Sequence, residues 1–116
     1  MNRMALGKAG EAAAKRFLEK QGYKILACNY RCAYGEIDLI CQDRETLIFV
    51  EVKTRSSSRF GSPAEAVTKS KQRRLYRLAQ VYLAENHQEE IPVRFDVLSL
   101  TATPAGMQIE HHIGAF

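Results

Sequence analysis

Two neighbouring segments, in which apolar and polar residues alternate, most constrain the fold of this chain. Residues 36–41 and 47–54 both alternate with the period of a β-strand, and the polar residues 42–46 between them are typical of a turn. We therefore predict a β-hairpin in this region. In its first strand, Ile37 and Leu39 are expected to share one face, together with the cysteine that follows them.

The remaining segments predict helices and strands around this hairpin. Apolar residues recur at helical spacing in two ranges, and a capping-box pattern with a proline at the first helical position marks the start of a short additional helix. In chain order, the predicted elements are helix 5–21 ending at Gly22, strand 23–31, strands 36–41 and 47–54, a short helix starting at Ser62, helix 69–85, and strands 93–100 and 107–113. This order predicts a mixed α/β domain covering residues 1–116, with a central mixed sheet of about five strands flanked by helices.

Length and composition exclude several other classes of protein. The chain has 116 residues, and its longest central apolar run, residues 47–50, is far shorter than the ~20 residues of a membrane span. The first eight residues contain no apolar signal-peptide core. The three cysteines, Cys28, Cys32 and Cys41, are an odd set without a CxxC pair, which favours a reducing compartment. We expect a cytoplasmic protein without a membrane segment.

Three charged residues interrupt the apolar pattern of the hairpin. Strand geometry places Glu51 and Lys53 on one face, about 6.6–6.8 Å apart, and Asp38 can lie opposite Glu51 if the register is right. Two carboxylates beside an ammonium group can bind Mg²⁺ or Mn²⁺ and support hydrolysis of a phosphodiester. The alternative is a surface ion pair among the same residues. The metal site is favoured because Glu51 and Lys53 continue the apolar face of Leu47 and Phe49.

The positive charge of the chain is concentrated in one segment. The formal net charge is +4, but residues 53–77 alone carry +7 and the remainder carries −3. Such asymmetry is typical of a surface that binds a polyanion, although a solvated basic helix would give the same pattern. If the polyanion is DNA, the candidate contacts are Arg55, Arg59, Lys69, Lys71, Arg73, Arg74 and Arg77.

The motifs of the hairpin also suggest a family. Residues 35–40 (GEIDLI) followed by 49–55 (FVEVKTR) resemble the bacterial YraN family, within the PD-(D/E)xK, restriction-endonuclease-like superfamily. Further matches extend over nearly the whole chain, at residues 7–11, 65–67, 71–72, 94–97 and 115–116. The resemblance implies a restriction-endonuclease-like core similar to that of archaeal Holliday junction resolvases, and a metal-dependent activity on DNA.

The resemblance also assigns roles to individual residues. Asp38 and Glu51 would be metal ligands, the backbone carbonyl of Val52 a further ligand, and Lys53 the catalytic lysine. An acidic residue on the first helix, Glu11, would join the active site.

Three further polar residues each have two interpretations. The resemblance places Gln72 in the active site, but an amide at this position can instead cap the start of helix 69–85. Glu11 borders the apolar stripe of its helix, so it can also simply reach into water. Asp96 either lies near the site or pairs with an arginine, and we expect the ion pair.

A zinc site is the competing metal hypothesis. Cys28, Cys32 and Cys41 could bind zinc together with His111 or His112, but structural zinc sites usually contain two closely spaced ligand pairs. Buried strand thiols are therefore the favoured interpretation. The two adjacent histidines should point to opposite faces of their strand, and we expect surface roles for them.

Together these patterns predict a cytoplasmic, Mg²⁺-dependent (or Mn²⁺-dependent) endonuclease that acts on DNA, with branched or structured DNA among the candidate substrates. The alternative is a nucleic-acid-binding module that keeps the fold with little or no catalysis. Symmetric cutting of a junction would require two active sites, so a homodimer is a candidate assembly.

Overall fold

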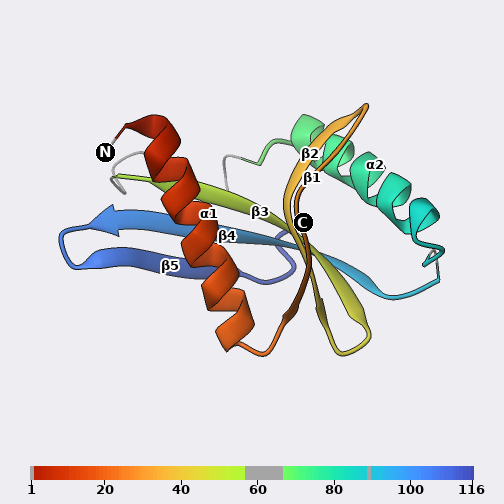
Figure 1. Cartoon of the computed structure of the whole chain (residues 1–116). Coiled ribbons are helices and arrows are strands. Elements are labelled where there is room, and N and C mark those ends of the chain that lie inside the picture. Colours follow the sequence, from red (N-terminus) through yellow and green to blue (C-terminus); the bar gives the residue numbers. More distant parts are fainter. Residues whose placement is uncertain (1, 57–66, 89) are drawn as a thin grey trace.

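A computed structural model describes residues 2–56, 67–88 and 90–116, which form two helices and five strands (Figure 1). In chain order, the elements are α1 (Arg3–Lys20), β1 (Lys24–Cys32), β2 (Gly35–Asp43), β3 (Thr46–Arg55), α2 (Lys69–Glu85), β4 (Val93–Thr103) and β5 (Gly106–His112). The predicted α/β fold is confirmed, and it is compatible with a restriction-endonuclease-like core. Within the described ranges, neither helix is long and apolar enough to cross a bilayer. The predicted helix start at Ser62 lies outside the described residues, as does Arg59.

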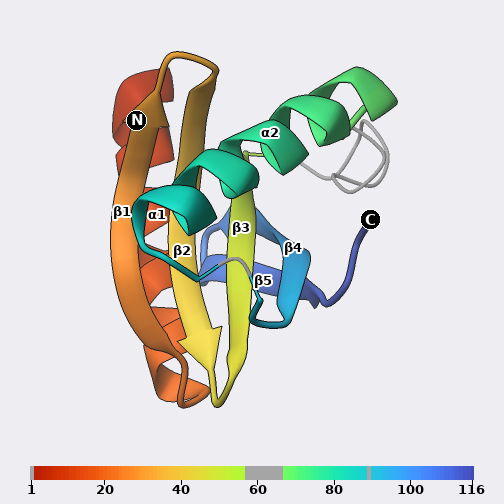
Figure 2. The same ribbon diagram turned by 90° about the vertical axis from the view of Figure 1, so that its right-hand side faces the viewer.

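The five strands form one mixed sheet in the order β1-β2-β3-β4-β5. All neighbouring strands are antiparallel except β3 and β4, which are parallel. Parallel neighbours need a crossover connection, and α2 lies in the segment between them. Figure 2 shows α2 on one face of the sheet and α1 on the opposite face.

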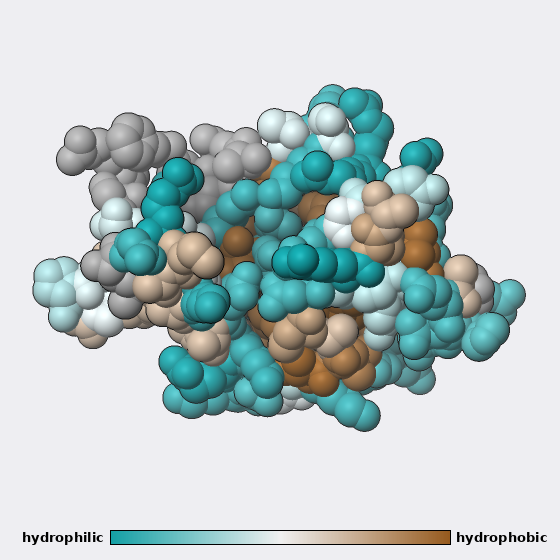
Figure 3. All heavy atoms as spheres, turned by 45° about the horizontal axis from the view of Figure 1, so that its top comes forward, coloured by the Kyte–Doolittle hydropathy of each residue, from teal (hydrophilic) through white to brown (hydrophobic). Residues whose placement is uncertain are grey.

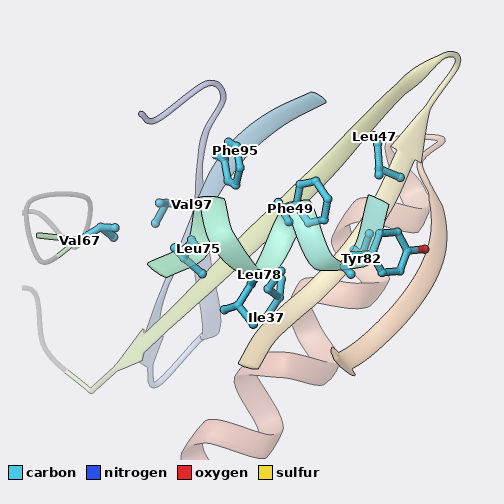
Figure 4. Packing of buried hydrophobic residues seen from close by; sticks show 11 residues of the cluster. Ile37, Leu47, Phe49, Val67, Leu75, Leu78, Tyr82, Phe95 and Val97 are labelled. Atoms are coloured by element: carbon cyan, nitrogen blue, oxygen red, sulfur yellow. The ribbon is translucent and has the colours of Figure 1, made fainter. Parts of the chain in front are cut away.

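Each helix covers its own hydrophobic core. On the α2 face, Leu75 and Leu78 pack against side chains of β2, β3 and β4 (Figure 4). On the α1 face, Ala14 and Leu18 pack against the opposite sides of the same strands. The α1-side core comprises Ala14, Leu18, Leu39, Cys41, Ile48, Val50, Leu98 and Leu100. A sheet covered on both sides holds its central strands rigidly, and the charged residues of the hairpin belong to these strands.

The alternation of β2 is interrupted at Asp38. Leu39 packs in the α1-side core, but Ile37 packs in the α2-side core, so the prediction that they share a face is wrong. Two features accompany the interruption. Asn29, opposite Asp38 on β1, has a φ of 53°, and the β2–β3 pairing ends at Leu39 and Val50. The backbone therefore changes direction where the first candidate carboxylate lies.

A buried ion network ties β4 to β5 and to the C-terminal residues. The fully buried Asp96 accepts two hydrogen bonds of 2.9 Å from Arg94, so the expected ion pair is confirmed. It also contacts His111 Nε2 at 2.7 Å and accepts a bond from the Gly114 N–H at 2.9 Å. Burial alone would raise the pKa of Asp96, but these bonds together lower it. The expected surface role of His111 is wrong, because only 11% of its side chain is exposed.

Helix α1 lies very close to β3 at one glycine. A Cβ atom built on Gly10 would lie 1.9 Å from Thr54 Oγ1 and 2.8 Å from Thr54 Cβ. Because the threonine Cβ is attached directly to the backbone of β3, it cannot move aside cheaply. Gly10 thus sets the distance between α1 and the strand that carries Glu51 and Lys53.

This contact gives a prediction with a control on the same helix. Gly10→Ala should lower the free energy of unfolding by about 2 kcal/mol, because the added methyl group overpacks the α1–β3 contact. Gly7→Ala should raise it by about 0.5–1 kcal/mol, because no atom lies within 4 Å of the added group and alanine favours the helix. Chemical denaturation of both variants measures the difference. Equal effects of the two substitutions would contradict the close packing of α1 on β3.

Candidate active site

The site begins where β2 and β3 stop pairing. Leu39 and Val50 are the last paired residues, and continuing their register brings Asp38 to the level of Glu51. The two carboxylates do not share the common face that was predicted, because Asp38 lines a hollow beside α1 and Glu51 contacts Lys71 of α2. In place of a further backbone bond, Asp38 Oδ2 accepts a 2.8 Å hydrogen bond from the Val52 N–H. A strand residue directs its N–H and C=O toward the same edge, so the Val52 carbonyl also faces the Asp38 side.

Glu51 lies on the other side of this junction, facing α2. It is only 8% exposed, and its Oε1 lies 2.6 Å from Lys71 Nζ and 3.5 Å from Lys53 Nζ. Lys71 was predicted as a DNA contact alone, so its place beside Glu51 was not expected. Its spacing could have revealed it, because Leu75 and Leu78 follow at i+4 and i+7 and both are buried.

Burial and neighbouring charges shift the pKa values of three residues in the cluster. Burial raises the pKa of Asp38 to about 7, and the charges of Glu51 and Glu11 add to the effect. Burial and the neighbouring Lys71 lower the pKa of Lys53. Burial opposes the charge of Lys71, but its bond to Glu51 raises its pKa overall. The cluster therefore combines a buried carboxyl group that holds its proton more tightly, a lysine that stays protonated, and a lysine that gives up its proton more easily.

Helix α1 adds Glu11 to the surroundings of Asp38. These two carboxylates line a common hollow of about 320 Å³, together with Lys8, Lys15, Cys28 and Asn29 among others. Glu11 is partly buried, and it is close enough for its charge to affect Asp38. The structure thus brings together four of the predicted residues, Asp38, Glu51, Lys53 and Glu11.

The donor set of this cluster suits a hard divalent cation. Its candidate ligands are carboxylate and carbonyl oxygens, which Mg²⁺ prefers, and Mg²⁺ usually keeps several waters besides one or two carboxylates. A divalent charge would also offset the repulsion between Asp38 and Glu51. Within residues 2–56, 67–88 and 90–116, no three His, Cys, Asp or Glu side chains gather as a ready metal centre. A cation at Asp38 and Glu51 would therefore depend on the Val52 carbonyl and on water for its other ligands.

The cysteines do not form a comparable group. Cys41 is buried in the α1-side core, whereas Cys28 is exposed on β1, and all three thiols are free. The described residues therefore give no support to the zinc hypothesis.

Within the described ranges, neither Gln72 nor the exposed basic residues of α2 form a hydrogen bond or ion pair with Asp38, Glu51 or Lys53. The Gln72 amide donates to the Val67 carbonyl at 3.0 Å, just before the start of α2, which is the capping arrangement. Arg55 is partly buried at the end of β3. Four candidate DNA contacts are exposed along α2: Lys69, Arg73, Arg74 and Arg77. Figure 3, which brings the top of Figure 1 forward, shows mostly hydrophilic residues with smaller hydrophobic areas between them.

The raised pKa of Asp38 predicts a pH-dependent cost to stability in the presence of a chelator. Between pH about 4 and about 7, the folded chain retains a proton on Asp38 that the unfolded chain has already lost, so stability falls as pH rises through this range. Asp38→Asn removes the charge and should be more stable than the parent above pH 7, by about 1–2 kcal/mol. The advantage should vanish near pH 4.

Thermal unfolding at several pH values measures this difference. Glu45→Gln is the matched control, because Glu45 is an exposed carboxylate in the turn between β2 and β3 and its charge does not contribute to the raised pKa of Asp38. The unfolding temperature of this control should change with pH in the same way as that of the parent. A parallel curve for Asp38→Asn as well would refute the electrostatic strain at Asp38.

Comparison with known proteins supports a common family for chains of this kind. The family model described as "Uncharacterised protein family UPF0102" matches residues 10–100. A UPF0102 protein of Symbiobacterium thermophilum is 55% identical over 101 residues, covering 87% of this chain and 86% of its own length. Similar proteins of Nocardia farcinica and Geobacter metallireducens are 48% and 45% identical, covering 98% and 100% of this chain and 90% and 95% of their own lengths. The chain therefore belongs to the UPF0102 family.

Proposed function

We propose that this protein is a metal-dependent endonuclease that hydrolyses DNA phosphodiester bonds. The observation that carries the proposal is the convergence of Asp38, Glu51 and Lys53 at the point where β2 and β3 part. The residues 35–40 and 49–55, with their resemblance to the YraN family and the PD-(D/E)xK superfamily, support the same function. The exposed arginines of α2 supply a surface for the DNA backbone.

Each residue of the cluster has a chemical role in this proposal. Asp38, Glu51 and the Val52 carbonyl would hold Mg²⁺ or Mn²⁺, which when bound lowers the pKa of a water and neutralises phosphate charge. Lys53 orients the attacking water or stabilises the negative charge of the transition state. Its lowered pKa brings it closer to the range in which it can also exchange a proton. Glu11 completes the acidic surroundings from α1.

Lys71 has a different role from the one that its charge suggests. Its ammonium group is 2.6 Å from Glu51 Oε1, so it balances and orients this carboxylate from α2. The same contact is compatible with the alternative function, a nucleic-acid-binding module without catalysis, because Lys71 neutralises Glu51 without a metal. Cytoplasmic location, branched DNA as substrate and a homodimer remain parts of the proposal that rest on the sequence.

Cleavage assays distinguish the nuclease from the binding module. Purified protein is incubated with linear, flapped and four-way-junction DNA, with Mg²⁺ or Mn²⁺ and separately with a chelator. Cutting should require the metal. Asp38→Asn and Lys53→Ala should each reduce the rate by at least about 10²-fold while the thermal unfolding transition stays cooperative.

The control variant is again Glu45→Gln, an exposed carboxylate in the turn between β2 and β3. It should retain the parental rate. Cleavage that survives both site substitutions would sink the assigned mechanism. Binding without metal-dependent cutting would favour the module.

A further inference from the structure

A second polar hollow lies between α2 and the turn that joins β1 to β2. Its volume is about 520 Å³, and it is lined by Ala33, Tyr34, Arg73, Arg74 and Arg77. We call it the arginine–tyrosine recess. Among the described residues, none of its three guanidinium groups forms an ion pair within 4.0 Å. No carboxylate among the described residues therefore pairs with the positive charge of the recess.

Tyr34 gives the recess an aromatic wall. It lies in the turn between β1 and β2 and remains 46% exposed, which is unusual for a large ring. The Arg77 guanidinium lies 5.1 Å from the centre of the ring, a cation–π contact that holds the tyrosine toward α2. A large part of the ring surface is nevertheless open to a ligand.

The turn also lies close to the helix at Gly35. Gly35 has a φ of 134°, and a Cβ built on it would lie 3.6 Å from Arg74 Cδ and 3.7 Å from Leu78 Cδ1. The backbone of the turn is thus about one methyl group away from van der Waals contact with α2. A preformed hollow of this kind loses little entropy when a ligand binds.

The recess is formed beside the same two elements, β2 and α2, that contribute to the candidate active site. Gly35 precedes Asp38 by three residues on β2, a distance of about 10 Å. On α2, Arg74 follows Lys71 by three residues, about one turn further along the helix. Both elements that hold the carboxylate cluster therefore continue into the recess.

We propose that the recess binds an unpaired DNA strand that leaves the duplex near the candidate active site. One base stacks on Tyr34, and the arginines bind the phosphates beside it, which is how aromatic and basic side chains together hold single strands. In a duplex the base faces are already stacked on their neighbours, so a ring at the surface has no partner there. At about 3.4 Å per nucleotide for a strand whose bases stay stacked, the distance of about 10 Å along β2 corresponds to about three nucleotides. The inference rests on the proposed function, because it assumes that DNA passes those carboxylates.

The test measures binding rather than cutting. Fluorescence anisotropy in a chelator compares a blunt duplex with duplexes that carry oligo-dT tails of one to six nucleotides. The parent should bind tailed DNA more tightly than blunt DNA, on the order of tenfold, once the tail reaches about three nucleotides. Tyr34→Leu should abolish this gain and Tyr34→Phe should keep it, because stacking needs the ring but not the hydroxyl group.

Two arginine variants complete the test. Arg73→Gln should weaken binding of tailed DNA, whereas Arg16→Gln, an exposed arginine on α1, should leave the gain unchanged. An unchanged gain in Tyr34→Leu, equal binding of blunt and tailed DNA by the parent, or competition by poly-glutamate as effective as by oligo-dT would overturn the inference. The binding assay contains no metal, so it does not depend on cleavage. A failure of the nuclease proposal would appear only in the cleavage assay, and the binding of tailed DNA could still be compared between variants.

Discussion

The hydrogen bond from the Val52 N–H to Asp38 is the contact on which the arrangement of the candidate site depends. It replaces the backbone bond that would otherwise continue the β2–β3 pairing beyond Leu39 and Val50. Before this point the two strands are buried on both faces of the sheet, and after it they carry charged side chains. A carboxylate that takes over a backbone bond is fixed in place, so Asp38 stays near Glu51 despite their mutual repulsion.

Helix α2 connects the core to the surface chemistry. Leu75 and Leu78 pack on the sheet, Lys71 contacts Glu51, and the arginines on the remaining side face solvent. Because one rigid helix carries all three groups, the charge near the carboxylates and the charge offered to a polyanion have a fixed spatial relation. The modest net charge of +4 is therefore the sum of an acidic cluster between the strands and a basic helix beside it.

Sequence periodicity predicted the elements well, because most of them are covered on one or both faces by a core. The strand period correctly placed Glu51 on the face of Leu47 and Phe49, which α2 covers, and helix 69–85 was predicted with the bounds that the structure has. The face of Ile37 was predicted wrongly, since the change at Asp38 depends on the partner strands and not on local pattern.

Two residues were misjudged for another reason. Lys71 was judged by its charge, although its spacing from Leu75 and Leu78 places it on the inner side of α2. The partner of His111 is the buried Asp96, and no local pattern connects these two residues across the β4–β5 pair. Whether Gln72 has a catalytic role is likewise beyond what spacing can decide, because its amide is bonded to Val67 at the helix start.

The parallel pairing of β3 with β4 also implies an order of assembly. The β1–β2–β3 meander and the β4–β5 hairpin join residues close in sequence, whereas the β3–β4 pair joins residues on either side of α2. Local contacts generally form before distant ones, because closing a long loop costs more entropy. The carboxylates of Asp38 and Glu51 would then come together on the nascent meander before Lys71 arrives. Their combined negative charge would attract the basic helix toward the sheet, so the acidic cluster would help to guide the last large step of folding.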